Sequence, residues 1–330
     1  MSGQIPLVWT EIGRMPGAYV MNAITIHREL FPDIPRYLVV SEEFAAKVSN
    51  DLCTVVTEED LLDSENAKKF EVLGKNWSYK DISYWQNTTR RFFILENFMN
   101  SLNFEKIIHL ESDCILLEAN YIFKLFIQDS WGLKYTMQDD LIACASIFLV
   151  NQKSSLSSFN EFILQKWLTK DITDMKLLHD FILNNSQATY LPSGSDNIEE
   201  IVFDAGTIGR YFLGGDSRNN LIPFSTRGLL PSGSGFFDPT PYRIKINQKK
   251  VILESIDDSS KSLLLGCVHV HSKRIPRSSR KFFKMLVRES GGSRGKLWQI
   301  GRLDFTVLAE RVVSKLFRVI NSKSPDKRYR

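Results

Sequence analysis

Short apolar runs alternate with helix-like segments along the first 150 residues. The runs are nearly continuous, as expected for strands buried on both faces of a sheet. They lie at Pro6–Trp9, Tyr37–Val40, Cys53–Val56, Lys106–Leu110 and Ala143–Val150. Helices are predicted between them at Ala18–Leu30 and Gln86–Leu102, the second with apolar side chains three and four residues apart. This order predicts an α/β fold with a mostly parallel sheet flanked by helices.

The pattern becomes less regular after residue 150. A helix is predicted at Ser154–Leu168, and two further strands at Val251–Leu253 and Leu263–His271. Residues Leu191–Gly235 are rich in Gly, Ser, Pro and Asn, which predicts long loops around one short helix. Long loops in a compact domain are often functional.

The charge is divided unevenly along the chain. The 330 residues carry a net charge of +4, but Lys273–Arg330 alone contain 17 Lys and Arg against 4 Asp and Glu. The first 272 residues are therefore acidic. We predict a catalytic domain at residues 1–275 and a basic helical extension at 276–330.

The basic extension contains a predicted amphipathic helix at Asp304–Ile320. Basic helices with an apolar face bind anionic membrane surfaces. The alternative is that the apolar face packs on the rest of the protein. No nucleic-acid-binding module is recognisable, so nucleic acid is not an expected partner.

The cysteines and the lack of targeting signals predict a cytoplasmic protein. Four cysteines occur without metal-binding spacing, which favours reduced, buried thiols: Cys53, Cys114, Cys144 and Cys267. Neither a signal peptide nor an apolar stretch of membrane-spanning length is visible. Together with the basic extension, this predicts a location at the inner face of the cell membrane.

An apolar strand ends on two carboxylates at Glu111 and Asp113. Ligands bind beyond the carboxyl ends of strands in open parallel sheets. Side chains two residues apart leave the strand on the same side, so both can reach one Mg²⁺ or Mn²⁺ ion. A solvated acidic loop is the alternative.

Two of the five histidines fall in one strand, beside Lys273. Cys267, His269 and His271 face one side of that strand, yet they lie too far apart to chelate a single zinc ion. We predict that one histidine binds the metal opposite Asp113, with His271 favoured over His269 because it lies at the strand end. Lys273 would approach phosphates as a point charge.

The run KIIHLESDCILL resembles the DxD element of GT-A glycosyltransferases, with Glu111 in place of the first Asp. The HVHSK segment at residues 269–273 is similar to their late His-and-Lys element. The resemblance covers about residues 5–275 and lies mainly in the order of these elements. It implies a GT-A fold, a nucleotide-diphosphate sugar as donor, with UDP favoured, and a divalent metal.

The resemblance also implies roles for five further residues. Thr10 and Gly13, after the first strand, would contact the nucleotide, and Arg91 would bind the donor, as would Glu111. Asp174, or else Asp204 in the run FDAGTIGRY, would act on the acceptor side. The structural alternatives are a surface charge for Arg91 and a helix cap for the Thr173–Asp174 pair.

The resemblance implies a glycosyltransferase of bacterial capsule or lipopolysaccharide synthesis, acting on a glycan or lipid-linked acceptor. The placement of Asp174 and the late histidine favours retention over inversion at the sugar. Two alternatives are a metal-dependent phosphohydrolase and a non-catalytic membrane or polysaccharide adaptor.

Overall fold

The computed structural model describes residues 4–48, 51–74, 82–128, 131–167, 173–194, 200–215 and 237–290. The predicted helix at Asp304–Ile320 and most of the Gly-rich 191–235 region lie outside these ranges. No helix among the described residues is long and apolar enough to cross a membrane.

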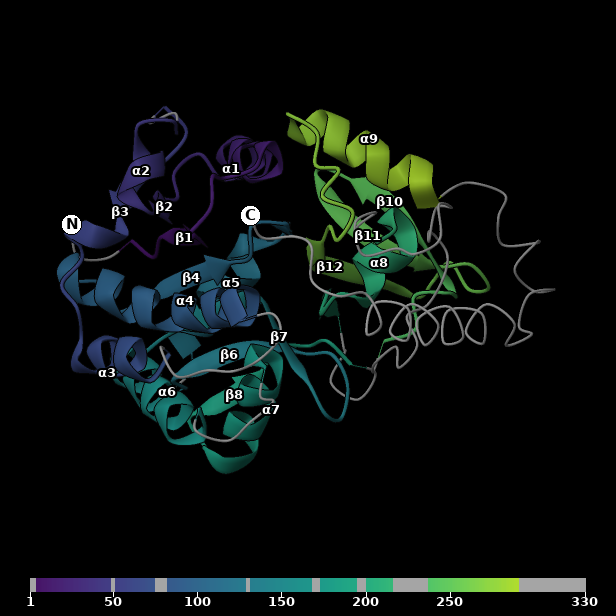
Figure 1. The fold of residues 1–330 in the computed structure, drawn as a ribbon. Coiled ribbons are helices and arrows are strands. Elements are labelled where there is room, and N and C mark those ends of the chain that lie inside the picture. The colour runs from purple at the N-terminus through teal and green to yellow at the C-terminus, as the bar shows by residue number, and fades with distance from the viewer. Residues whose placement is uncertain are drawn as a thin grey trace, which may run out of the picture.

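A seven-stranded sheet forms the centre of the larger half of the protein (Figure 1). Its strand order is β3-β2-β1-β4-β7-β6-β8. The first four strands are parallel, β7 is antiparallel to both β4 and β6, and β8 pairs in parallel with β6. The strands are β1 (Leu7–Glu11), β2 (Arg36–Val40), β3 (Thr54–Thr57), β4 (Ile107–Leu110), β6 (Leu133–Met137), β7 (Ala143–Val150) and β8 (Ala188–Tyr190). The predicted α/β fold is confirmed, with one antiparallel strand inside the sheet.

A second, smaller sheet was not anticipated from the sequence. It consists of β5 (Cys114–Leu116), β9 (Ile201–Phe203), β10 (Tyr242–Asn247), β11 (Lys250–Ser255) and β12 (Ser262–His269). Strands β10, β11, β12 and β5 pair antiparallel, and β9 runs parallel to β12. Only three residues separate the end of β4 from the start of β5, so the acidic turn between them joins the two sheets.

Helices cover both faces of the large sheet because its strands alternate their side chains between two cores. Leu7 and Trp9 join the core formed with α1 (Ala18–Leu30) and α5 (Ala119–Gln128). Val8 joins the opposite core. The helices of that opposite core are α3 (Glu65–Gly74), α4 (Ile82–Ser101), α6 (Lys153–Lys166) and α7 (Asp174–Asn184). A short α2 (Glu42–Ala45) follows β2.

The smaller sheet is covered by α8 (Thr207–Leu213) and α9 (Ser279–Ser290). Phe282 and Leu286 of α9 are fully buried in a core shared with α1 and the smaller sheet. Helix α9 therefore packs on the body of the protein, although the predicted boundary at 275/276 assigned it to the extension. The apolar face of α9 thus packs against the rest of the protein.

His27 fixes α1 to the smaller sheet. Its Nδ1 lies 2.6 Å from the Ala23 carbonyl oxygen, and its Nε2 accepts a hydrogen bond from the Leu116 amide at 2.9 Å. The ring is therefore neutral, with its proton on Nδ1. Burial lowers the pKa of His27 to about 4.

We predict that His27 makes the protein sensitive to mild acid. The unfolded chain takes up the proton near pH 6.5 and the folded protein only near pH 4, so stability is full above pH 6.5 and declines as the pH falls towards 4. His27 should account for about 2 kcal/mol of the loss in unfolding free energy between about pH 7 and pH 5. The variant His27→Gln should lose correspondingly less over that interval in denaturant titrations. An identical loss in both proteins would contradict this role.

Candidate active site

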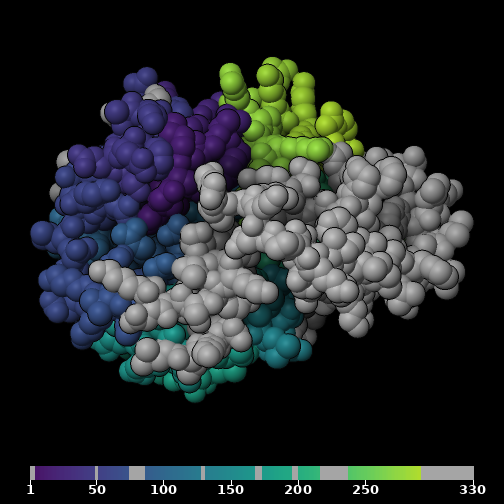
Figure 2. All heavy atoms as spheres, in the orientation of Figure 1, coloured from purple at the N-terminus to yellow at the C-terminus, as the bar shows by residue number. Residues whose placement is uncertain are grey.

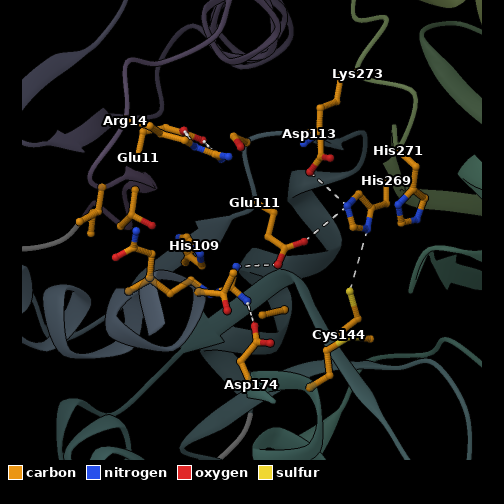
Figure 3. A pocket seen from close by; sticks show the side chains of 18 of the residues that line it. Glu11, Arg14, His109, Glu111, Asp113, Cys144, Asp174, His269, His271 and Lys273 are labelled. Atoms are coloured by element: carbon orange, nitrogen blue, oxygen red, sulfur yellow. Dashed lines mark hydrogen bonds and ion pairs between the residues drawn. The ribbon is translucent and has the colours of Figure 1, made fainter. Parts of the chain in front are cut away.

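A cavity of about 510 Å³ lies beyond the carboxyl ends of β1 and β4, where the end of β12 meets the large sheet (Figure 3). Nine of the ten residues chosen from the sequence line it: Thr10, Gly13, Arg91, Glu111, Asp113, Asp174, His269, His271 and Lys273. Only Asp204 is missing from its wall. The roles of the nine stay predictions, but their convergence means that one ligand can contact all of these segments.

The acidic turn and the end of β12 are held together by backbone hydrogen bonds. The Glu111 amide donates to the Ser146 carbonyl of β7 at 3.0 Å, and the Val270 amide donates to the Asp113 carbonyl at 2.7 Å. His269 also pairs in register with Cys114, directly after Asp113. This pairing brings residues that are far apart in sequence to one point.

His269 is the histidine that meets the carboxylates. Its Nε2 lies 3.1 Å from Asp113 Oδ1 and 3.4 Å from Glu111 Oε2. Burial alone would lower the pKa of His269, but the Asp113 charge and hydrogen bond raise it well above its usual value. Burial alone would raise the pKa of Asp113, yet the His269 charge holds it well below its usual range. The two groups form an ion pair of carboxylate and imidazolium.

His271, which we favoured from the sequence, lies on the other side of the His269 ring from Asp113 and Glu111 (Figure 3). Its Nε2 is 3.1 Å from the Gly206 carbonyl oxygen, and its ring stacks on His269 with centroids 4.0 Å apart. Burial lowers the pKa of His271 to about 3. The physical reason is the strand pairing: β12 ends at His269, so His271 lies beyond the position opposite the acidic turn.

Arg91 joins the two acidic parts of the cavity. Its guanidinium donates to Glu111 at 2.6 Å and to Asp174 at 2.7 Å. Burial alone would lower the pKa of Arg91, but the two carboxylates outweigh it and raise the pKa. The alternative of a surface charge is therefore wrong, because Arg91 is only 8% exposed.

Thr173 makes the predicted helix cap, while Asp174 lies in the cavity wall. Thr173 caps α7, since its side-chain oxygen accepts from the Lys176 amide at 3.3 Å. Asp174, the first residue of the helix, lines the cavity and is 4% exposed. Burial raises the pKa of Asp174, and Arg91 partly offsets this.

The turn after β1 has a backbone that favours glycine. Gly13 has a φ of +68°, and a Cβ there would lie 3.2 Å from the Asn87 side chain. Its amide donates to Ser41 Oγ at 3.1 Å, and Ser41 donates to Glu58 at 2.7 Å. This chain of hydrogen bonds ties the turn to the ends of β2 and β3. The turn also places a Glu11–Arg14 ion pair, 2.7 Å long, on the cavity wall.

Lys273 also lines the cavity. Its ammonium group is 5.2 Å from the centre of the Tyr19 ring, and its amide donates to the Val270 carbonyl at 2.8 Å. Sequence reasoning missed several other residues of the wall, including His109, Cys144, Glu11 and Asn87. His109 was detectable in principle, since it lies two residues before Glu111 on the same side of β4.

Asp204 is a buried anchor outside the cavity. Its carboxylate accepts from the amides of Gly206, Ile208 and Gly209 at the start of α8, and from the His269 amide at 2.9 Å. Four backbone donors saturate its oxygens. Asp204 thus holds α8 against β12, and of the two aspartates predicted for the acceptor side only Asp174 lines the cavity.

The donor groups at the acidic turn fit a divalent cation. Two carboxylates and one imidazole nitrogen converge there, and oxygen ligands suit Mg²⁺ and Mn²⁺, while an added imidazole favours Mn²⁺ of the two. Cys144 also lies close: its sulfur, a Glu111 oxygen and a His269 nitrogen all fall within 4.8 Å of one another.

Comparisons with known proteins give no family assignment. No protein-family model and no curated protein matches the sequence. Solved structures that align with this chain include mouse xyloside xylosyltransferase 1, at 12% identity over 58% of this chain and 86% of that one, with a TM-score of 0.42. The galactosyltransferase LgtC aligns at 13% identity over 71% and 87%, with a TM-score of 0.39.

A glycosyltransferase involved in glycosylation of the major capsid of PBCV-1 aligns at 11% identity over 57% and 82%, with a TM-score of 0.33. All three neighbours are glycosyltransferases. At these identities and TM-scores the likenesses carry no weight, so the function has to be inferred from the cavity itself.

Proposed function

We propose that this protein is a glycosyltransferase that moves a sugar from a nucleotide-diphosphate donor, with UDP favoured, to a glycan or lipid-linked acceptor. The observation that supports this best is the convergence of Glu111, Asp113 and His269 at the carboxyl edge of a parallel sheet. This edge is where open α/β sheets bind nucleotides. The cavity also combines a cation at Lys273 with a buried carboxylate at Asp174, as transfer from a diphosphate requires.

A divalent cation would be held by Asp113 and His269, with Glu111 beside them. Bound there, it supplies charge neutralisation for the departing diphosphate. The nearest oxygens of Asp113 and Glu111 already lie 3.1 and 3.4 Å from the His269 Nε2 atom. Cation binding would replace the imidazolium proton of the apo ion pair.

The remaining side chains would bind and orient the two substrates. The turn at Thr10–Gly13 would receive the nucleoside, and Lys273 would pair with the diphosphate. Arg91 holds Glu111 and Asp174 in fixed positions on opposite sides of its guanidinium. Asp174 would then take the proton of the acceptor hydroxyl or stabilise positive charge at the anomeric carbon.

The surface charge supports a membrane location. The cations Arg277, Arg280, Lys281, Lys284 and Arg288 are exposed on or just before α9, which lies at the surface in Figure 2. We infer that this face contacts anionic lipid at the inner side of the cell membrane. Such a placement suits a lipid-linked acceptor in the synthesis of a bacterial surface polysaccharide such as capsule or lipopolysaccharide.

The first prediction concerns the donor site. In thermal unfolding experiments with UDP, GDP or CDP, one of the three nucleotides should raise the midpoint temperature of unfolding. It should do so only when Mn²⁺ is present, because the cation bridges protein and diphosphate. The variant Asp113→Asn should lose this shift, and Asp258→Asn, which changes a partly exposed acid of the β11–β12 connection, should keep it. Equal stabilisation in chelator would argue against the metal. Release of free sugar or phosphate without an acceptor would favour a phosphohydrolase instead.

The second prediction concerns Asp174. The variant Asp174→Asn should lower kcat by about 10²-fold or more and leave donor affinity within about 3-fold, because it removes a proton acceptor and keeps the side chain's shape. Asp180→Asn on the same helix is the matched control, since Asp180 pairs with Lys176 at 2.6 Å and lies outside the cavity wall. Comparable kcat values in the two variants would exclude a catalytic role for Asp174.

The third prediction concerns the membrane. The full chain should sediment with anionic phosphatidylglycerol vesicles and not with phosphatidylcholine vesicles. Reversing two charges on α9, with Lys281→Glu and Lys284→Glu, should weaken binding about tenfold or more, since each basic residue contributes about 1 kcal/mol. The same reversal on α3, with Lys68→Glu and Lys69→Glu, should have little effect. Equal binding of the protein to the anionic and the phosphatidylcholine vesicles would contradict the inference.

A further inference from the structure

The backbone of His269 is held in place from two sides. Its amide donates to Asp204 Oδ2 at 2.9 Å. Its carbonyl oxygen lies so close to Gly209 of α8 that a Cβ at Gly209 would be only 1.9 Å away. The lack of a side chain at Gly209 therefore lets α8 approach the backbone of β12 at His269. Gly206 leaves room for the neighbouring His271 ring, since a Cβ there would lie 2.8 Å from His271 Nε2.

The imidazole of His269 presents its two nitrogens to different partners. Nε2 faces the carboxylates of Asp113 and Glu111, while Nδ1 lies 4.0 Å from the sulfur of Cys144 (Figure 3). Stacking on His271 restricts the tilt of the ring. Cys144 is thus the side chain that contacts the nitrogen turned away from the carboxylates.

The pairing of β6 with β7 is irregular beside Cys144. The register between β6 and β7 shifts between Tyr135 and Thr136, so Thr136 lies opposite Cys144. The Thr136 hydroxyl donates to the Cys144 carbonyl at 2.9 Å and fixes the backbone there. Cys144 is 6% exposed and lines the cavity wall. A bulge that redirects a side chain next to a site is a common use of this irregularity.

We propose that Cys144 is a positioning residue for the metal ligand His269, an inference that rests on the proposed function. The Cys144 sulfur accepts a hydrogen bond from Nδ1–H of His269, so that the Nε2 lone pair faces the cation between Asp113 and Glu111. Histidine ligands of metals need such an acceptor at the other nitrogen, which fixes both the tautomer and the ring orientation. Here a thiol takes the place that a carboxylate or carbonyl usually holds.

Direct ligation of the cation by the Cys144 sulfur is the competing arrangement. The sulfur, a Glu111 oxygen and a His269 nitrogen lie within 4.8 Å of one another. The observed contact favours positioning: the sulfur lies against Nδ1, whereas the carboxylates lie against Nε2. A cation bound at Nε2 would therefore lie on the side of the ring that faces away from the sulfur.

The test compares Mn²⁺ affinity, measured by electron paramagnetic resonance, in wild type and three variants. Cys144→Ala removes the acceptor and should weaken Mn²⁺ binding about 10-fold or more. Cys144→Ser keeps an acceptor and should stay within about 3-fold of wild type. Cys53→Ala, at a buried free cysteine near β3, is the control and should not change affinity. Nucleotide affinity in chelator and the thermal midpoint show whether each variant is folded.

Two spectroscopic readouts separate positioning from the alternatives. In ¹⁵N-histidine spectra of the Zn²⁺-loaded protein, His269 should carry its proton on Nδ1 in wild type and in Cys144→Ser. Unchanged Mn²⁺ affinity in Cys144→Ala would overturn the inference. An intense sulfur-to-metal band in the Co²⁺-loaded protein, absent from Cys144→Ser, would also overturn it and assign direct ligation. If wild type binds no divalent cation, the proposed function fails together with this inference.

Discussion

The ion pair between Asp113 and His269 joins segments 156 residues apart in sequence and connects the two sheets of the protein. Asp113 lies in the turn that leaves the large sheet, and His269 ends the longest strand of the small one. Two buried charges are tolerated here because each compensates the other. The backbone hydrogen bond from the Val270 amide to the Asp113 carbonyl and the Asp204 anchor hold this geometry.

The rest of the cavity continues this pairing of charges. Glu111 contacts both His269 and Arg91, and Arg91 in turn contacts Asp174, so an unbroken line of alternating charge crosses the floor. Each of the three carboxylates has a cationic neighbour, which favours its ionised form against the effect of burial. A donor diphosphate with its cation would add to one end of this line, and an acceptor would meet Asp174 at the other. This separation of donor and acceptor ends is what transfer between two substrates requires.

Sequence patterns predicted the parts of this arrangement that depend on local structure. A buried apolar run ending on Glu111 and Asp113 was enough to locate the acidic turn, and capping chemistry located the start of α7. The choice between His269 and His271 could not be made locally. Period-two alternation puts both on one side of β12, and only the pairing of His269 with Cys114 shows which one faces the acids.

Long-range features account for the other differences. The small sheet was missed because β5 has three residues and pairs with a strand about 150 positions away. Asp204 resembled a catalytic acid in sequence, and only its four backbone donors reveal an anchor. Cys144 has no sequence signal, since a single cysteine in an apolar strand ordinarily belongs to the core. The register shift beside it arises from pairing with β6, which local sequence does not reveal.

The most direct test of the central claim is the position of a bound cation. Crystals grown with Mn²⁺ and UDP would be measured at a wavelength where manganese scatters anomalously. The account predicts one anomalous peak in contact with Asp113, His269 Nε2 and the diphosphate, with the nucleoside at the turn after β1. A nucleotide bound elsewhere, or a peak that avoids Asp113 and His269, would contradict it.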